Sequence, residues 1–421
     1  MTSTFINARL IDPESGSESL GSLTVNAGLI TARDAAPTGE IIDCDGQYLA
    51  PGIIDIGVKI GEPGERHKES FRTAGLAAAA GGVTTMVTRP DTSPPIDTPE
   101  LLDFFRNRAR DLCAVNVLPM AALTKGREGR EMTELGFLAD AGAVAFTDGD
   151  APVVDTKVLT RAMTYAAADG ALIIGHTQDP VLSAGAAATS GPLASKMGLP
   201  AVSAMAERLR LDHDLTLVEM TGARYHIDQI TTAAALPALL RARKAGLKVT
   251  AGISVHHLTL NEFDIEGYRS FFKFKPPLRA ESDRVAMVTA LAEGAIDIIC
   301  SLHTPQDEES KRLPFEAAAS GAVGLETLLS AALQLVHADH ITLPALFAAL
   351  ALNPARLLGL PAGRLSIGAP ADLVLFNPNT PFILDRSNLQ SKSKNTPYDG
   401  RRMQGRVLGT WVAGRRVWGQ K

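Results

Sequence analysis

Cysteine is scarce in this sequence, and long apolar or basic runs are missing. The three cysteines, Cys44, Cys113 and Cys300, are widely spaced and include no Cys-x-x-Cys pair, which is typical of buried thiols in a reducing compartment. No apolar run approaches the roughly 20 residues of a membrane span, and the N-terminus lacks the charged and apolar regions of a signal peptide. We therefore expect a cytoplasmic protein that does not bind membranes.

The charge of the chain excludes a further class of partner. Its net charge is -5, its pI is about 6.0, and no basic run is interleaved with aromatic residues. Nucleic acid is therefore not an expected partner. The 421 residues are enough for one large barrel of about 250 residues and a smaller accessory domain.

The middle of the chain alternates short β-rich runs with longer helical segments. This alternation is typical of repeated βα units and a parallel sheet. Helices are predicted over residues 68–80, 98–110, 202–221 and 325–336, among others. The candidate strands lie near residues 52–60, 83–88, 114–119, 143–147, 171–176, 224–230, 248–254 and 296–303. The pattern favours an α/β fold closed into a (β/α)8 barrel, and a doubly wound open sheet is the alternative.

The two ends of the chain have a different pattern. Short alternating runs such as residues 22–25 and 372–376 are broken by Gly, Pro and Asn. They predict a small β domain whose halves, residues 1–50 and 359–421, pair in space around a barrel of residues 51–358. The polar segment 380–398 is predicted to form an ordered loop over one end.

Several short motifs occur along the chain in a fixed order. Their sequences are Pro-Gly-Ile-Ile-Asp at 51–55, Glu-Pro-Gly at 62–64, Ala-Gly-Gly-Val-Thr-Thr at 80–85, Val-His-His-Leu at 255–258, Pro-Pro-Leu-Arg at 276–279, Gly-Leu-Glu-Thr at 324–327, Asn-Pro-Ala-Arg at 353–356 and Gly-Ala-Pro-Ala-Asp-Leu at 368–373. In this order they resemble dihydroorotase of the amidohydrolase superfamily over nearly the whole chain. The resemblance implies a TIM barrel of the amidohydrolase type with a small β-sandwich domain formed by both termini.

The resemblance also locates the family's metal-ligand positions, and most of them are changed. They fall on Gly57, Lys59, Asp148, His176, Gln229 and Leu302, of which only Asp148 and His176 could bind a metal. Leu302 takes the position of the metal-bound aspartate that serves as general base. Because catalytic zinc typically has three protein ligands, we expect no cofactor and no catalytic residue.

The positions that bind substrate in the family are changed as well. The arginine that would hold the substrate carboxylate falls on Gly61, and an asparagine that donates to it becomes Asp91. Lys275 and His303 are the other vestigial substrate positions that the resemblance implies. The strand places Lys59 toward the former metal site, and we expect it to form an ion pair with Asp148, which would otherwise be unpaired.

These replacements imply a function without catalysis. The chain is similar to inactive dihydroorotase-like homologues of pyrimidine biosynthesis that assemble with the catalytic chain of aspartate transcarbamoylase, as homo- or hetero-oligomers, and support its architecture or activity. One alternative is an active metal-dependent cyclic-amide hydrolase, a dihydroorotase or a hydantoinase- or allantoinase-like enzyme, with zinc in an atypical site. The other alternative is a regulator that binds a metabolite in the old pocket.

Overall fold

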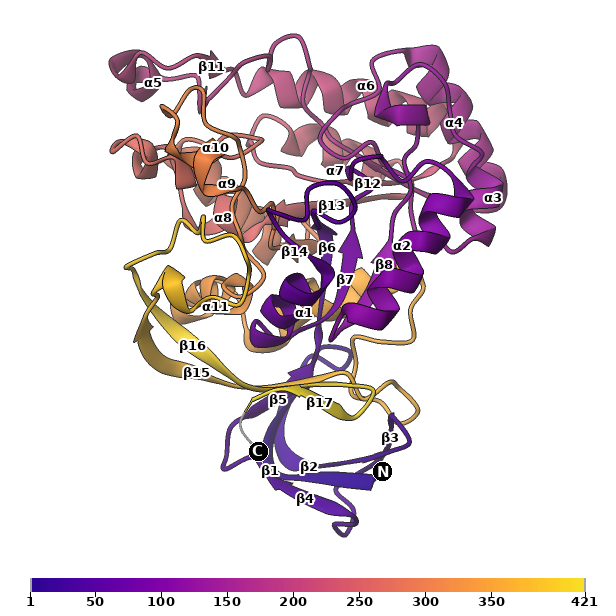
Figure 1. The fold of residues 1–421 in the computed structure, drawn as a ribbon, viewed down its shortest axis with the longest axis vertical. Coiled ribbons are helices and arrows are strands. Elements are labelled where there is room, and N and C mark those ends of the chain that lie inside the picture. The colour runs from indigo at the N-terminus through magenta and orange to yellow at the C-terminus, as the bar shows by residue number, and fades with distance from the viewer. Residues whose placement is uncertain (1, 420–421) are drawn as a thin grey trace.

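A parallel barrel forms the centre of the protein, whose computed structural model describes residues 2–419 (Figure 1). The isolated bridges of Phe146 to Ala121 and to Ile173 supply the fourth of its eight strand positions. The other seven are β6 (Ile53–Val58), β7 (Val83–Thr88), β8 (Asn116–Pro119), β9 (Leu172–Gly175), β12 (Arg224–Ile227), β13 (Val249–Ser254) and β14 (Ile298–Cys300). This arrangement confirms the predicted α/β class and the (β/α)8 type of fold.

Hydrogen bonds between the first and last strands close the barrel. The backbone N–H of Lys59 donates to the carbonyl oxygen of His303 at 2.9 Å. The buried carboxylate of Asp55 on β6 accepts from the backbone N–H of Ser301 at 2.8 Å and from the Ser301 hydroxyl. Asp55 therefore satisfies polar groups at the seam, as a buried carboxylate must.

Helices surround the barrel, and local sequence fixes their ends. Ser70 and Thr73 form a capping box at the start of α1, and Thr98 caps α2 with proline in its first turn. The longer helices are α1 (Phe71–Ala80), α2 (Pro99–Leu112), α4 (Thr156–Asp169), α6 (Met205–Thr221), α7 (Leu236–Lys244), α9 (Glu281–Ala292) and α11 (Leu328–His337). The short ones are α3 (Leu135–Asp140), α5 (Pro192–Met197), α8 (Val255–Thr259), α10 (Glu308–Arg312), α12 (Leu343–Phe347) and α13 (Asn353–Leu358). Within residues 2–419, no helix is both long and apolar enough to cross a membrane.

Strands from both chain ends pair in one mixed sheet below the barrel (Figure 1). Antiparallel pairing of β5 with β15 joins the two halves, and Phe5 packs edge-on against Trp411 in the core beside them. The sheet order is β17 (Arg415–Trp418), β16 (Arg402–Val412), β15 (Leu373–Ile383), β5 (Tyr48–Pro51), β1 (Thr2–Asp12), β2 (Ser17–Asn26) and β3 (Leu29–Arg33), with β4 (Glu40–Asp43) beside β1. The terminal segments thus meet in space although the barrel separates them in sequence.

Residues 389–398, which we call the strap, run from the terminal sheet across the barrel beside α11 (Figure 1). The buried carboxylate of Glu69 accepts from the Ser391 hydroxyl and from the backbone N–H of Lys392 at 3.1 Å. Glu326 accepts from the backbone N–H groups of Gln390 and Ser391 at 2.8 to 2.9 Å. The carboxylates of Glu69 and Glu326 therefore hold the strap in place mainly by accepting hydrogen bonds from its backbone N–H groups.

The Glu69→Ala variant is expected to release the strap. Two strap donors would lose their acceptor, so local opening should become more frequent and the exposed Lys392 should be cleaved faster by trypsin. Limited proteolysis with mass spectrometry would detect the cut. Glu100→Ala, at an exposed position on α2, serves as control, and equal cleavage rates for the two variants would refute the anchoring role.

Candidate functional site

The carboxyl ends of the barrel strands form a mouth, where the family resemblance places its site. On β6, Gly57 has a backbone φ of +92°, and a Cβ atom there would meet only the Asp228 carboxylate, at 3.7 Å. Two residues later, the Lys59 ammonium lies 3.3 Å from Glu65 and 3.4 Å from Asp91. The first strand thus presents an open space and a paired cation where two metal-binding histidines would stand.

A chain of ion pairs continues from Lys59 across the mouth. The Arg89 guanidinium donates to both oxygens of Asp91, at 3.2 and 2.7 Å, and lies 3.6 Å from Asp150. Asp91 and Arg89 are both buried, and such bidentate pairs are the strong kind. We call Lys59, Asp91, Arg89 and Asp150 the mouth ion-pair chain.

Two further cations surround its last member. Arg127 lies 3.2 Å from Asp150, and Lys275 lies 3.3 Å from the other oxygen of the same carboxylate. Burial opposes ionisation of Asp150, but Arg89, Lys275 and Arg127 together hold the pKa of this carboxyl well below its usual range. Lys275, one of the vestigial substrate positions, therefore has an internal partner.

The predicted ion pair between Lys59 and Asp148 is wrong. Asp148 accepts hydrogen bonds from the backbone N–H groups of Leu123 and Thr124, at 2.9 and 3.0 Å, and from the Thr124 hydroxyl. Three donors from the loop after β8 satisfy this carboxylate, so it does not need a cation. Asp150, two residues later, is the acid that reaches the mouth, and the spacing of the motif alone did not distinguish the two.

His176 lies at the mouth, close to the Asp228 carboxylate. Its side chain is 2% exposed, its Nδ1 is 3.6 Å from Asp228, and neither ring nitrogen has a hydrogen-bond partner among residues 2–419. The motif alignment missed Asp228 because it selected the next residue, Gln229. The Gln229 amide instead donates to the Cys300 sulfur and accepts from the backbone N–H of Ser254, so it joins neighbouring strands.

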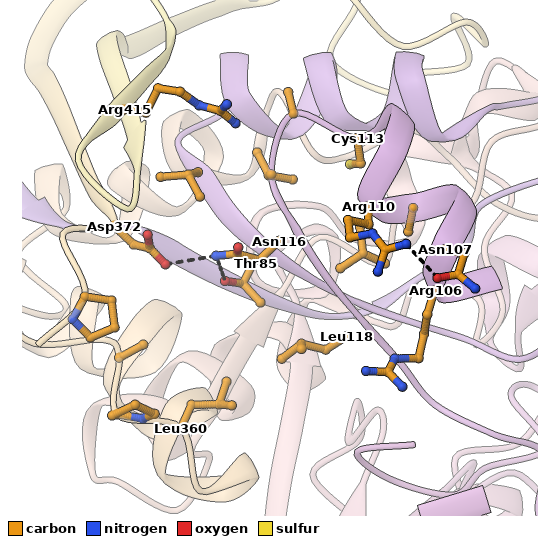
Figure 2. A pocket seen from close by; sticks show the side chains of 18 of the residues that line it. Thr85, Arg106, Asn107, Arg110, Cys113, Asn116, Leu118, Leu360, Asp372 and Arg415 are labelled. Atoms are coloured by element: carbon orange, nitrogen blue, oxygen red, sulfur yellow. Dashed lines mark hydrogen bonds between the residues drawn. The ribbon is translucent and has the colours of Figure 1, made fainter. Parts of the chain in front are cut away.

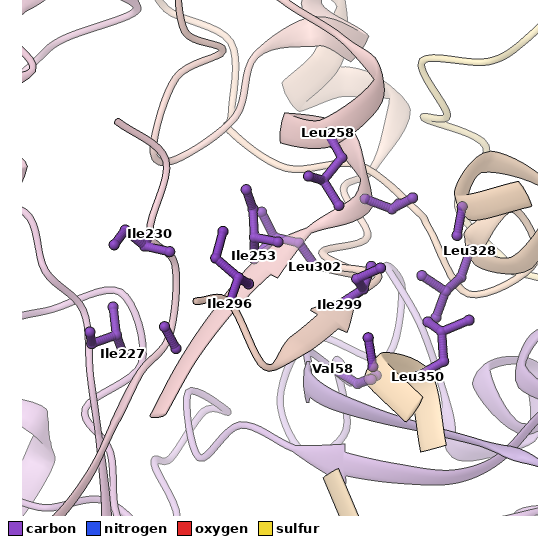
Figure 3. Close-up of a cluster of buried hydrophobic side chains, with 14 of the residues drawn as sticks. Val58, Ile227, Ile230, Ile253, Leu258, Ile296, Ile299, Leu302, Leu328 and Leu350 are labelled. Carbon is purple, nitrogen blue, oxygen red and sulfur yellow. The ribbon is translucent and has the colours of Figure 1, made fainter. Parts of the chain in front are cut away.

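Leu302 belongs to the hydrophobic core. Its side chain is 5% exposed and lies beside Ile253 and Ile299 (Figure 3). Its backbone φ is +49°, a left-handed conformation that aspartate and asparagine tolerate and leucine rarely adopts. The backbone at this position thus suits the family's aspartate, while the side chain supplies only packing.

The other two vestigial substrate positions are closed to a ligand. A Cβ atom at Gly61 would lie 2.3 Å from the carbonyl oxygen of Glu65, so no arginine fits there without movement of the 61–69 loop. His303 is fully buried, with Nδ1 accepting from the backbone N–H of Gly324 and Nε2 lying 3.6 Å from Glu69. His303 therefore lies among the groups that hold the strap.

The donor set does not fit a catalytic zinc ion. Throughout residues 2–419, no group of three or more His, Cys, Asp or Glu side chains is arranged so that it could hold a metal. At the mouth, His176 and Asp228 are the nearest to such a group, and the adjacent acid Asp150 is engaged by three cations. Since catalytic zinc takes three protein ligands, no step through a bound metal follows from these residues.

Buried histidines should make the protein sensitive to acid. Burial lowers the pKa of His226 and His257 to about 4 and that of His256 to about 3, from an ordinary value of 6.5. Below pH 6.5 the unfolded chain binds these protons and the folded chain does not, so stability falls as pH drops from 6.5 toward 4. Asp55, whose pKa burial raises to about 6, acts in the opposite direction, as do other carboxyls whose pKa burial raises, such as Asp297 and Glu326, so the effect of one histidine is best isolated in a variant.

Urea unfolding between pH 4.5 and 7 measures this effect. His256 stacks between Phe274 and Tyr398, so the His256→Phe variant keeps aromatic packing and removes one titrating group. In this variant, the free energy of unfolding should change less steeply with pH, by an amount that corresponds to about one proton fewer taken up on unfolding. His340→Gln, at an exposed position, is the control and should leave the slope unchanged. A His256→Phe slope equal to that of the wild type would contradict the assignment.

Comparisons with known proteins agree with this fold and these motifs. Residues 46–235 match the family described as dihydro-orotase-like, and residues 321–418 match the amidohydrolase family. A dihydroorotase of Wolbachia sp. subsp. Drosophila simulans is 39% identical, over 99% of this chain and 96% of the relative. A dihydroorotase-like protein of Pseudomonas aeruginosa is 38% identical, over 98% and 99%.

A solved structure extends the likeness to three dimensions. The L-hydantoinase (dihydropyrimidinase) of Arthrobacter aurescens superposes with a TM-score of 0.89 at 23% identity, covering 99% of this chain and 98% of the hydantoinase. At that identity the match concerns the fold. Together with the two sequence relatives, it places the chain in the dihydroorotase-like family of amidohydrolases.

Proposed function

We propose that this chain is a non-catalytic dihydroorotase-like protein that serves pyrimidine biosynthesis as a structural or regulatory partner of aspartate transcarbamoylase. The observation that carries the proposal is the mouth ion-pair chain, in which Lys59 takes a metal-ligand position of the family and Asp91 takes a substrate position. A zinc ion lowers the pKa of bound water from about 15.7 to about 7, a difference worth about 12 kcal/mol. The described side chains offer no equivalent activation of water.

The preserved fold supports a role in which the surface of the protein binds a partner. The barrel and the terminal sheet keep packed cores, whereas four of the six metal-ligand positions of the family no longer carry a residue that could bind a metal. This combination is expected for a protein that acts through the shape of its surface and not through catalysis. A stable complex would need about 800 Å² of this surface for each partner.

Isolation of the protein from its own cells tests the partnership. We expect a complex of fixed ratio with aspartate transcarbamoylase in gentle gel filtration, with the masses confirmed by native mass spectrometry. Mixing the two separately purified chains should form the same complex. Recovery of this chain alone under both conditions would overturn the proposed partnership.

An active cyclic-amide hydrolase is the competing function, and the name of the Wolbachia relative favours it. The two functions differ in metal content and turnover. Protein produced in zinc-supplemented medium should contain far less than one zinc per chain and should not open the ring of dihydroorotate or hydantoin. Stoichiometric zinc together with ring opening would establish the hydrolase instead.

A metabolite-binding regulator is favoured by one observation, the unpaired nitrogens of His176. A ligand that bound there would stabilise the folded state, by an amount that rises with the logarithm of its concentration above the dissociation constant. Thermal unfolding with dihydroorotate and carbamoyl aspartate separates this function from the others. An unfolding temperature that rises with the concentration of one of these ligands, and no longer does so in His176→Ala, would support a sensor.

A further inference from the structure

The outer face of α6 carries a row of exposed apolar side chains. Met205, Leu209 and Met220 are 42%, 52% and 67% exposed. Together with the exposed Thr216 they follow spacings of four, seven and four residues, which keeps them on one side of the helix. We call these four residues the α6 row. Both α6 and α4 lie at the periphery of the barrel, far from the terminal sheet (Figure 1).

Charged side chains follow the α6 row along the edge that faces α7. Arg208 lies 3.5 Å from Asp212, whose other carboxylate oxygen lies 3.0 Å from Arg241 on α7. Glu219 comes eleven residues, or three turns, after Arg208, so both lie on this edge. Glu219 is exposed and has no hydrogen-bond or ion-pair partner within residues 2–419. The edge thus has a cation near one end and a free anion near the other.

At the N-terminal end of α6, a loop adds further apolar surface. The backbone N–H of Asp179 donates to the carbonyl oxygen of Ala206 at 3.0 Å. This hydrogen bond places the exposed Val181 and Leu182 beside the start of the helix. The apolar surface is therefore wider than the α6 row itself.

At the C-terminal end of α6, α4 adds an aromatic side chain. The Thr156 hydroxyl lies 2.9 Å from the His213 ring, and helices of successive βα units run parallel. Tyr165, nine residues after Thr156, therefore lies level with the end of α6, close to Met220. It is exposed as well. Apolar side chains thus stand at both ends of the face, and polar ones stand in the middle.

The size of this face suits a stable protein contact. The 17 residues of α6 span about 26 Å. Neighbouring helices lie about 10 Å apart, so the face with its flanking elements has an area on the order of 800 Å². A specific interface of ordinary size buries about 800 Å² of each partner.

The geometry points to the outer face of α6 as the contact surface between two copies of this chain. The two α6 helices would pack antiparallel about a two-fold axis that passes between the positions of residues 212 and 213. Met205 of one copy would then meet Met220 of the other copy. Leu209 would meet Thr216, because this pair is centred on the same point. The contact is isologous, as in most dimers of identical chains.

The charged edge is what favours a second copy as the occupant of this face. Arg208 and Glu219 are centred within one residue of the same axis, so the cation of each copy would meet the anion of the other. Asp212, near the axis, keeps its own partner Arg241. The face is therefore complementary to itself. It uses none of the mouth residues, so the contact does not depend on the proposed partnership with aspartate transcarbamoylase.

The cavity of about 570 Å³ between α2 and the terminal sheet is a less suitable contact surface. The Asn116 amide in its wall already donates to Thr85 at 3.3 Å and to the Asp372 carboxylate at 3.0 Å (Figure 2). Arg110 turns toward Asn107, to which it donates at 2.8 Å. These groups pair within the chain, whereas the α6 row does not.

Sedimentation equilibrium of the full chain at micromolar concentrations tests the contact. We expect a dimer, and removal of one exposed charge should weaken it little, so the charges are reversed instead. Arg208→Glu and Glu219→Arg should each raise the dissociation constant about tenfold or more, because each creates two repulsive pairs per dimer. The double variant Arg208→Glu/Glu219→Arg should restore it to within about threefold of the wild type.

A charge in the middle of the contact should have a larger effect. Leu209→Glu should be monomeric, whereas Val285→Glu, at an exposed apolar position on α9, is the control and should dimerise like the wild type. Circular dichroism will verify that all variants fold. A monomeric wild type, or a Leu209→Glu variant that dimerises normally, would overturn the contact. A double variant that stays weak would overturn the antiparallel arrangement. A monomeric wild type that loses binding to aspartate transcarbamoylase on Leu209→Glu would assign the face to that partner instead.

Discussion

The Glu207→Ala variant is expected to lose about 3–5 kcal/mol of unfolding free energy. Glu207 on α6 is fully buried and accepts from the backbone N–H groups and hydroxyls of Thr231 and Thr232. It also accepts from Gln178 at 2.9 Å and faces Arg279 at 3.3 Å. Truncation would leave Arg279, itself buried, without its carboxylate partner, and would remove the acceptor of five other donors.

Chemical denaturation monitored by circular dichroism measures this loss. Glu219→Ala lies on the exposed face of the same helix and should change stability by no more than about 0.5 kcal/mol. Glu207→Gln keeps the shape and one acceptor, so its stability should fall between wild type and Glu207→Ala. A Glu207→Ala variant as stable as Glu219→Ala would mean that the network contributes nothing.

The Asp91→Ala variant is expected to lose about 3 kcal/mol of unfolding free energy. In Asp91→Ala the buried Arg89 would lose its bidentate partner, and Lys59 would keep only Glu65. The cost should be smaller than for Glu207, because Asp150 still lies 3.6 Å from Arg89. Equilibrium unfolding at neutral pH gives the difference.

Two other variants separate charge from shape at this position. Asp91→Asn restores the family's residue and keeps an acceptor, so it should lose less stability than Asp91→Ala. The double variant Lys59→Met/Asp91→Asn removes a cation together with the anion and should recover part of the loss. If all three variants have the same unfolding free energy as the wild type, the mouth ion-pair chain does not stabilise the protein.

The barrel could be predicted from sequence because each of its strands shows the same kind of local pattern, a short apolar run followed by a helical segment. Each of the eight predicted strand positions carries a strand or, at Phe146, a strand bridge. Buried parallel strands are continuous apolar runs between turn residues, and that signal survives without knowledge of the partner strand. The pairing of the two chain ends was predictable from their alternating pattern.

The site was less predictable because side-chain partners depend on details of loops. Asp148 and Asp150 differ by two positions, and only the path of the loop after β8 decides that Asp148 meets backbone donors. Likewise, the sequence identified Asp91 only as the replacement of an asparagine that contacts the substrate, whereas in the structure it bridges Lys59 and Arg89. Motif spacing identifies positions, but it does not show which charges they meet.

The backbone at Leu302 has a consequence for any attempt to rebuild a metal site at the mouth. Its left-handed conformation would accept the family's aspartate without strain, yet that carboxylate would enter an apolar core. A carboxylate introduced alone at this position would therefore cost stability, because the surrounding side chains offer it neither a cation nor a hydrogen-bond donor. Backbone and side-chain surroundings thus favour opposite residues at one position.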